Sequence, residues 1–198
     1  SMGFVEGESL ASLIGRNPLS PQKSAQMLLK ISEAIVYAHG EGVIHRDLKP
    51  ANVLLDRKNN PHISDFGLAK KVTSGSNLTV TGQILGTPSY MSPEQASGAT
   101  DQTNEISDVY SLGALLYCCL TGHAPFQAAN PMETLRQVVE RDPVAPRQLN
   151  SQVDLDLDTI CLKCLEKDPQ RRYQSAQELV DELNRFLAGQ PIQARRIS

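Results

Sequence analysis

The chain has 198 residues, of which 40% are hydrophobic, and a formal net charge of −3. This length and composition are typical of a globular protein with one sizeable core, and so small a net charge gives no indication of a nucleic-acid partner. The sequence contains no apolar stretch long enough to span a bilayer and no secretory signal at its start, so we expect a cytoplasmic location.

The first part of the chain is expected to be a short extended piece, a turn at Glu6-Gly7 and a short helix from about Glu8-Ser9. Ser20-Pro21 has the pattern of an N-cap followed by proline at the first helical position. Apolar residues then recur with helical spacing, until Gly40 or Gly42 ends the helix. Short apolar or β-branched runs at 43–44, 53–55 and 62–64 predict strands, and a turn at 59–61 joins the last two.

Residues 70–91 are rich in Ser, Thr and Gly and lack periodicity, which predicts a long loop of the kind that usually has a function. The segment 106–120 is apolar on several sides and should form a helix in the centre of the core. Further helices are expected at 131–140, 155–166 and 175–187, and Gly189-Gln190-Pro191 should end the last of them.

The four cysteines, at positions 118, 119, 161 and 164, do not have the spacing of a structural zinc site. Cys161-x-x-Cys164 could indicate a metal or redox pair, but both residues fall in a helical pattern of apolar positions, which favours small core residues. We therefore expect reduced thiols, as in a cytosolic protein.

The densest group of polar residues is the run His45-Arg46-Asp47-Leu48-Lys49-Pro50-Ala51-Asn52, and Asp65-Phe66-Gly67 follows it after one short hairpin. Asp47 can accept the proton of a hydroxyl group, and Lys49 can neutralise charge on a transferred phosphoryl group. Asn52 and Asp65 offer the hard oxygen ligands that magnesium prefers beside phosphate and water. Structural alternatives exist: Asp47 or Asn52 could cap a turn, Lys49 could be a solvated surface residue, and Asp65 could be a structural carboxylate.

These two motifs resemble the catalytic loop H-R-D-x-x-x-x-N and the D-F-G segment of protein kinases. Three further segments resemble later parts of the family's C-terminal lobe, in the right order: Gly86-Thr87-Pro88-Ser89-Tyr90-Met91-Ser92-Pro93-Glu94, Asp108-Val109-Tyr110-Ser111-Leu112-Gly113 and Asp168-Pro169-Gln170-Arg171-Arg172. Ser92 replaces the usual alanine of A-P-E, a change between two small residues. The resemblance covers residues 4 to about 187, and its character is that of bacterial, eukaryotic-like Ser/Thr kinases.

The resemblance implies a mainly α fold, a kinase-like C-lobe in which a helical bundle holds a small β-hairpin that carries the catalytic loop. It implies a hinge remnant at 1–7, the C-lobe at 8–187 and a linker or tail at 188–198. ATP and Mg²⁺ are the implied cofactors, with Mn²⁺ as an alternative ion. Asp47 and Lys49 would act in catalysis, and Asn52 and Asp65 would bind the metal. The nucleotide would meet Phe4 and Val5 of the hinge, Leu54 under the adenine, and Lys49.

The remaining roles that the resemblance implies are regulatory or structural. Arg46 would bind a phosphate on the activation loop, with Thr79 and Thr81 as the favoured acceptors and Thr73, Ser74 and Ser76 as weaker ones. Thr87 and Lys49 favour Ser/Thr over Tyr as the substrate. The structural residues are His45, Phe66, Gly67, Glu94, Asp108 and Arg172, of which Glu94 and Arg172 would form a buried ion pair.

The chain contains neither a G-x-G-x-x-G loop nor a strand of the V-A-I-K type, which the family carries in its small, N-terminal lobe. We therefore expect the N-lobe to be absent and the polypeptide alone to have little or no activity. The lobe face left exposed should be apolar and favour self-association. The expected partners are a protein with a Ser/Thr acceptor and the N-lobe of a parent kinase, which a segment beyond Ser198 could tether to a membrane. The alternative function is a pseudokinase or docking module without catalysis.

Overall fold

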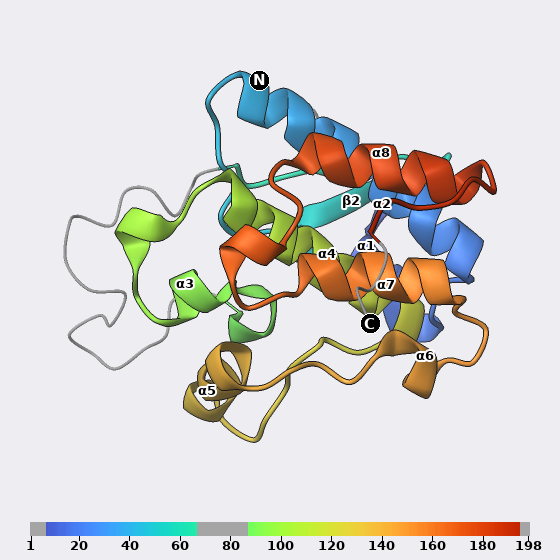
Figure 1. The fold of residues 1–198 in the computed structure, drawn as a ribbon. Helices are drawn as coiled ribbons and strands as arrows, with labels where there is room; N and C mark the ends of the chain where they lie inside the picture. The colour runs from blue at the N-terminus through green and yellow to red at the C-terminus, as the bar shows by residue number, and fades with distance from the viewer. Residues whose placement is uncertain (1–6, 67–86, 195–198) are drawn as a thin grey trace.

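The computed structural model describes residues 7–66 and 87–194, and this part is mainly helical (Figure 1). Its α-helices are α1 (Leu10–Arg16), α2 (Pro21–Gly40), α3 (Pro93–Ala96), α4 (Glu105–Thr121), α5 (Pro131–Glu140), α6 (Pro146–Leu149), α7 (Leu155–Cys164) and α8 (Ala176–Leu187). Its strands are β1 (Gly7–Ser9), β2 (Val53–Asp56) and β3 (Pro61–Ile63), and its 3₁₀ turns are η1 (Pro50–Asn52), η3 (Pro88–Tyr90), η4 (Thr100–Gln102) and η5 (Pro169–Arg171).

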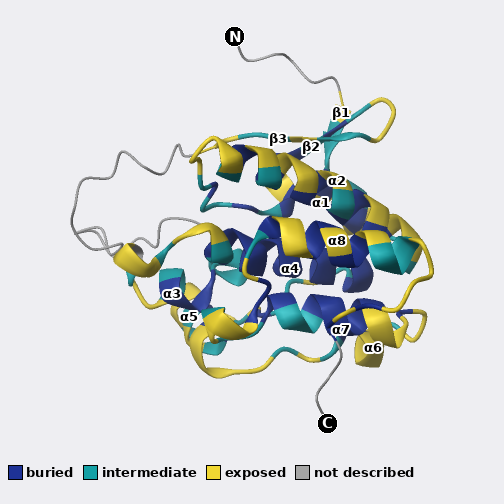
Figure 2. Ribbon diagram, turned by 45° about the horizontal axis from the view of Figure 1, so that its top comes forward, coloured by how far each residue is buried: buried dark blue, intermediate teal, exposed yellow. Residues whose placement is uncertain are grey.

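Helix α4 forms the centre of the core, as its apolar sequence predicts. Every residue from 107 to 121 is buried, and the helix packs against α2, α7 and α8. Figure 2 shows α4 as a buried element between α7 and α8. Asn104 caps its first turn, and Gly122 ends it in the left-handed conformation with φ of 79°. A helix buried on all sides can present polar residues of its first turn to the loops packed around it.

Helix α2 agrees with the prediction at both ends. Ser20 is its N-cap and accepts the N–H of Lys23, Pro21 is the first helical residue, and the helix ends at Gly40. The strand expected at residues 43–44 is not formed, since no strand pairs with this segment in the described part of the chain. It is an extended connection that leads from α2 into the catalytic-loop motif.

The sheet has three antiparallel strands in the order β1-β2-β3 and lies at one edge of the helices, opposite α5 and α6 (Figure 2). The turn expected at Gly7 is not formed, whereas the short helix expected from about Glu8-Ser9 is present and starts slightly later. Gly7–Ser9 pairs with β2 as a third strand, and the helix begins only at Leu10, with Ser9 as its cap. A side chain at Gly7 would lie 1.6 Å from the carbonyl oxygen of Leu55, so only glycine permits this pairing.

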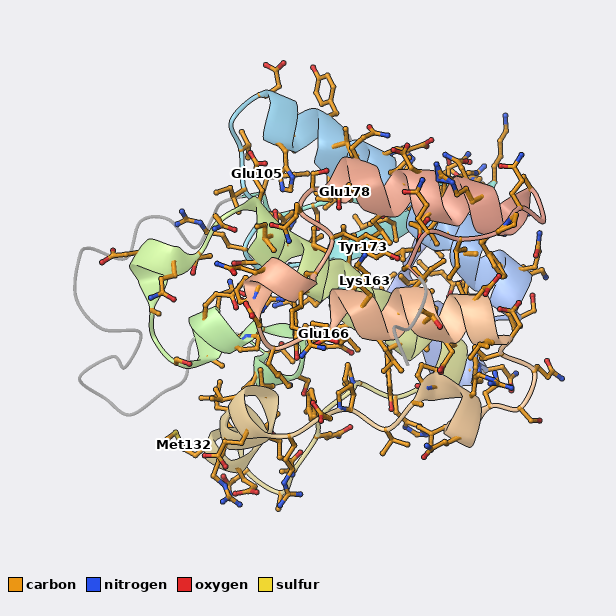
Figure 3. The ribbon with its side chains drawn as sticks, viewed as in Figure 1. Glu105, Met132, Lys163, Glu166, Tyr173 and Glu178 are labelled. Atoms are coloured by element: carbon orange, nitrogen blue, oxygen red, sulfur yellow. The ribbon has the colours of Figure 1, made fainter. Side chains whose placement is uncertain are left out.

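The segment after α8 remains packed on the lobe as far as the structure describes it. Ile192 and Ala194 are buried, and the backbone N–H groups of Gln193 and Ala194 donate to the buried carboxylate of Glu182 at 2.7 and 2.8 Å. Tyr173, beside the start of α8, donates to the same carboxylate at 3.3 Å. The ammonium group of Lys163 lies against the face of the Tyr173 ring (Figure 3). Residues 188–194 are therefore in contact with the lobe.

Helix α5 lies at the periphery, and Met132 at its start is exposed (Figure 3). The four cysteines lie in the core, as predicted, and burial raises the pKa of each thiol. Within the described ranges, no group of three or more His, Cys, Asp or Glu side chains is arranged to hold a metal ion. The helices found in the same ranges are too short or too polar to cross a membrane.

Candidate active site

The catalytic-loop motif lies between α2 and β2, and its polar side chains converge on Asp47. The ammonium group of Lys49 donates to Oδ2 of Asp47 at 2.9 Å. Asn52 donates from Nδ2 to the backbone oxygen of Asp47 at 2.9 Å and to Oδ2 at 3.2 Å. The Asp47 side chain keeps 35% of its surface exposed, so its carboxylate is held by two neighbours and is still open to a substrate.

Asp108 holds the backbone of this loop from the first turn of α4. Its carboxylate is fully buried and accepts the N–H groups of His45 at 2.8 Å and Arg46 at 2.9 Å. Arg46 has φ of 69°, a left-handed conformation that is unfavourable for a residue with a side chain. Such strain persists where the surroundings over-determine it, and it is common at functional sites. The Nε2 of His39 also donates to Asp108, at 2.8 Å.

His45 links the catalytic loop to the end of β3. Its Nε2 donates to the backbone oxygen of Ser64 at 2.9 Å, which leaves Nδ1 to accept the N–H of Asp47 at 3.3 Å. The rings of His45 and Phe66 meet edge to face, with centroids 4.7 Å apart. His45 therefore places the peptide of Asp47 relative to the segment that carries Asp65.

Asp65 lies next to this hairpin end, exposed, with φ of 61°. Ser64 connects Asn52 with Asp65. Its backbone N–H donates to the backbone oxygen of Asn52 at 2.9 Å, and its hydroxyl donates to Oδ2 of Asp65 at 3.0 Å. Asn52 donates to Asp47 with its amide nitrogen, which leaves its amide oxygen as the atom that could bind a cation. Two oxygen donors fit a magnesium ion that keeps its other positions for phosphate and water.

Leu54 lies on the sheet face opposite the core. Its neighbours Val53 and Leu55 are buried, whereas Leu54 is half-buried, in keeping with the alternation of side chains along a strand. This position leaves its side chain available to an apolar ligand such as an adenine ring. The other predicted nucleotide contacts, Phe4 and Val5, lie outside the described residues.

The regulatory residues are described only in part. Nε of Arg46 is buried without a hydrogen-bond partner, and Thr87 is exposed just before η3, with no hydrogen bond to Asp47 or Lys49 among the described residues. Thr79, Thr81 and Gly67 lie outside the described residues. The roles proposed for all five stay predictions.

Glu94 and Arg172 form a buried, bidentate ion pair. The guanidinium group donates to the two carboxylate oxygens at 2.8 and 2.9 Å, and Ser107 donates to the same carboxylate at 2.6 Å. Burial acts to raise the pKa of Glu94, but the hydrogen bonds from Arg172 and Ser107 and the charge of Arg172 outweigh it and lower that pKa. The pair ties α3 to the segment between α7 and α8.

Two residues of the site had no place in the sequence prediction. His39 adds its hydrogen bond to Asp108, and Gln95 donates to the backbone oxygen of Arg46 at 2.8 Å. The sequence contained one signal for Gln95, because Ser92-Pro93-Glu94-Gln95 has the S-x-x-Q pattern of a capping box. That pattern predicts the start of α3 but not the contact with a loop 49 residues earlier.

The helical lobe, its small antiparallel sheet and the loop that converges on Asp47 define the class of protein, which is a kinase-like C-lobe. Residues 1–183 match the family model of the protein kinase domain. The chain therefore belongs to the protein kinase family.

Its relatives are bacterial Ser/Thr kinases. The chain is 38% identical over 197 residues to serine/threonine-protein kinase PknB of Mycobacterium leprae. This alignment covers 99% of the chain and 31% of that relative. The chain is 41% identical over 196 residues to a probable serine/threonine-protein kinase of Streptomyces coelicolor, covering 98% of the chain and 29% of the relative. The chain thus spans about three-tenths of the length of these curated relatives.

Proposed function

We propose that these residues form the C-lobe part of the active site of a serine/threonine protein kinase. Such an enzyme transfers the γ-phosphate of ATP to a hydroxyl group of a protein. The observation that carries this proposal is the convergence of Lys49 and Asn52 on the carboxylate of Asp47, at 2.9 and 3.2 Å. A docking surface has no chemical need for a base, a cation and an amide around one partly exposed oxygen.

The roles follow from this geometry. Asp47 accepts the proton of the substrate hydroxyl as its oxygen bonds to the γ-phosphorus, and the bond from phosphorus to the bridging oxygen breaks to release ADP. Lys49, 2.9 Å from Asp47, stabilises the negative charge on the phosphoryl group. Asn52 and Asp65 would hold the magnesium ion, which neutralises charge on the phosphates when bound. Leu54 would support the adenine ring.

The names of the relatives support Ser/Thr specificity, and the family supports the use of ATP and Mg²⁺. We propose that the 198-residue polypeptide by itself transfers little phosphate, because its sequence contains neither the glycine-rich loop nor the strand lysine that position the nucleotide in this family. The protein substrate supplies a Ser or Thr hydroxyl.

The test measures phosphate transfer from ATP and Mg²⁺ to a peptide with one Ser acceptor, using the longest reading frame that contains these residues. Transfer should occur, should fall by about a thousandfold or more in Asp47→Asn, and should move to Thr but not Tyr when the acceptor is exchanged. The 198-residue polypeptide should give little transfer in the same assay. Equal transfer by wild type and Asp47→Asn would show that another group is responsible.

A docking module without catalysis is the second candidate, supported by the exposed apolar residues Met132, Leu149 and Leu155 away from the loop. Titration of Mg²⁺ with a fluorescent ATP analogue separates the two. Binding by wild type that Asp65→Asn weakens favours the enzyme. The absence of metal-dependent nucleotide binding in the longest reading frame favours the docking module.

A further inference from the structure

We propose that Gln95 is a positioning residue, which holds the peptide group between Arg46 and Asp47 so that the Asp47 carboxylate is oriented for phosphoryl transfer. This inference rests on the function proposed above. The amide nitrogen of Gln95, in α3, donates to the backbone oxygen of Arg46 at 2.8 Å. That oxygen belongs to the peptide group that leads directly into Asp47, and it lies two bonds from the Asp47 backbone nitrogen.

Arg46 is a residue whose peptide groups need outside support. Its φ of 69° places a residue with a side chain in the left-handed region. The N–H on one side of it is held by Asp108 at 2.9 Å, and the carbonyl on the other side by Gln95 at 2.8 Å. Side chains from two helices, α4 and α3, therefore fix the strained residue from both ends. Asp108 does not reach the carbonyl end. In the peptide group that leads into Asp47, Gln95 holds the oxygen at 2.8 Å, and Nδ1 of His45 accepts the Asp47 N–H at the longer distance of 3.3 Å.

The surroundings of Gln95 allow only one orientation of its amide. Oε1 accepts the backbone N–H of Ser92 at 3.0 Å and the Ser92 hydroxyl at 3.1 Å. If the amide were turned over, an N–H would face the Ser92 N–H, and an oxygen would face the Arg46 carbonyl. The donor toward Arg46 is thus fixed by the same capping box that starts α3. Gln95 thereby links Ser92, at the end of the activation-segment motif, to the catalytic loop.

Two substitutions separate positioning from simple stability. Gln95→Glu keeps an oxygen for Ser92 and still completes a capping box, but it turns a carboxylate oxygen toward the Arg46 carbonyl. Gln95→Met removes both polar groups. In the longest reading frame, both variants should lower kcat by about tenfold or more, because small misplacements of a catalytic group have large effects on rate. The KM for ATP and the midpoint of thermal unfolding of Gln95→Glu should stay near the wild-type values.

The pH dependence of kcat distinguishes a positioning role from a purely structural one, because a structural role would not change it. In Gln95→Glu, acid protonates the new carboxyl group, whose O–H can then donate to Arg46, so the ratio of variant to wild-type kcat should rise as the pH is lowered. Gln95→Met should show no such rise. The charged groups around this position, namely Arg46, Asp47, Asp108 and the Glu94–Arg172 pair, are present in wild type and in both variants, so a rise confined to Gln95→Glu reports the introduced carboxyl group. Gln148→Glu, an exposed site on α6, is the matched charge control and should keep wild-type kcat.

Hydrogen exchange tests the proposal without activity. In the 198-residue polypeptide, amides 45–47 should exchange faster in Gln95→Met than in wild type, while those of α4 and α7 are unchanged. If the wild-type protein transfers no phosphate, the proposed function fails and this exchange result still decides the positioning role. The proposal is overturned if both variants keep kcat within twofold of wild type, if the Gln95→Glu deficit is independent of pH, or if exchange at 45–47 does not change.

Discussion

At the scale of single residues, Arg172 shows how one buried charge joins distant segments. Its side chain is fully buried and donates to Glu94, to the backbone oxygens of Glu166 at 2.7 Å and Lys167 at 3.0 Å, and lies over the ring of Tyr110. With a fifth hydrogen bond, to the backbone oxygen of Ile106 at 3.3 Å, all five of its N–H groups are used within the protein. The neighbouring Arg171 is exposed and meets Glu166 only at 3.6 Å, so two adjacent arginines differ completely in their surroundings.

Replacement of Arg172 by Met should lower the free energy of unfolding by about 3–5 kcal/mol, because Glu94 is left buried without its partner. Arg171→Met removes an exposed ion pair and should change it by less than about 1 kcal/mol. Urea unfolding at pH 7 measures both. Similar losses in the two variants would contradict the assignment of stability to the buried pair.

The lowered pKa of Glu94 also predicts a pH dependence. Because this pKa is below its value in the unfolded chain, the stabilisation is present at neutral pH and is lost as the pH falls through the folded-state pKa. Glu94→Gln should therefore reduce the acid-induced loss of stability between neutral pH and pH 3. Unfolding curves at several pH values measure it, and an unchanged acid slope in the variant would argue against this role for Glu94.

At the scale of elements, the contact between α4 and α7 depends on a missing side chain. A Cβ atom at Gly113 would lie 2.4 Å from the Cβ of Cys164, and the backbone oxygen of Gly113 accepts from the Cys161 thiol at 3.6 Å. Gly15 of α1, in contrast, has no atom within 4 Å of such a position. Glycine in a helix interior is unfavourable in itself, so the close approach of two helices explains Gly113.

Gly113→Ala should destabilise the protein by about 1–3 kcal/mol or more, since α4 and α7 must move apart in a closely packed core. Gly15→Ala should be neutral or stabilising by up to about 1 kcal/mol, because alanine is the better helix former and meets no neighbour. Thermal unfolding of the two variants compares them directly. A stable Gly113→Ala variant would mean that the helices adjust without cost.

The same pair of helices predicts weakened stability in alkali. Burial raises the pKa of the four thiols, that of Cys164 to about 12, so above pH ~8.5 the unfolded chain releases protons that the folded chain keeps. The free energy of unfolding should then fall by up to about 1.4 kcal/mol per pH unit for each thiol. Burial lowers the pKa of Lys167 to about 8. Above that pH the folded chain has released this proton and the unfolded chain still holds it, so Lys167 alone raises the free energy of unfolding as the pH rises.

Urea unfolding under reducing conditions between pH 7 and 10 measures this slope. Cys161→Ala should make the slope shallower even though it removes core volume at every pH. An equal slope in wild type and variant would show that the buried Cys161 thiol does not contribute.

At the scale of the whole molecule, the segment after α8 closes the lobe. Glu182 is buried and receives the N–H groups of Gln193 and Ala194, and Ile192 is buried beside them. The family match ends at residue 183, so Glu182 lies within the matched range and the segment that donates to it lies beyond. The segment therefore contributes to the lobe through two backbone N–H groups, which donate to Glu182 of α8, and through the buried side chain of Ile192.

A polypeptide that ends after Gly189 should lose on the order of 3 kcal/mol of stability. It loses the burial of Ile192 and both backbone N–H donors to the buried carboxylate of Glu182, which keeps the Tyr173 hydroxyl as a donor. A polypeptide that ends after Ala194 retains both N–H donors and the apolar contact, and it serves as the matched comparison. Chemical unfolding of the two forms measures the difference. Equal stabilities would show that the segment only rests on the surface.

Local sequence patterns determined most of the helices and the catalytic core of the site. The cap at Ser20, the apolar run of α4 and the spacing from His45 to Asn52 each depend on residues near one another in the chain, which periodicity and motif spacing report directly. They were sufficient to identify the family and to bring Asp47, Lys49 and Asn52 together.

Only the tertiary structure decided what depends on contacts between distant segments. Gly7 joins a strand because β2 approaches it closely, Gln95 reaches a loop 49 residues away, and Ile192 is buried by a helix that precedes it. No local pattern encodes these contacts, because each depends on how whole elements pack around α4. The sequence by itself therefore determined the chemical groups of the site, and packing decided which neighbours hold them in place.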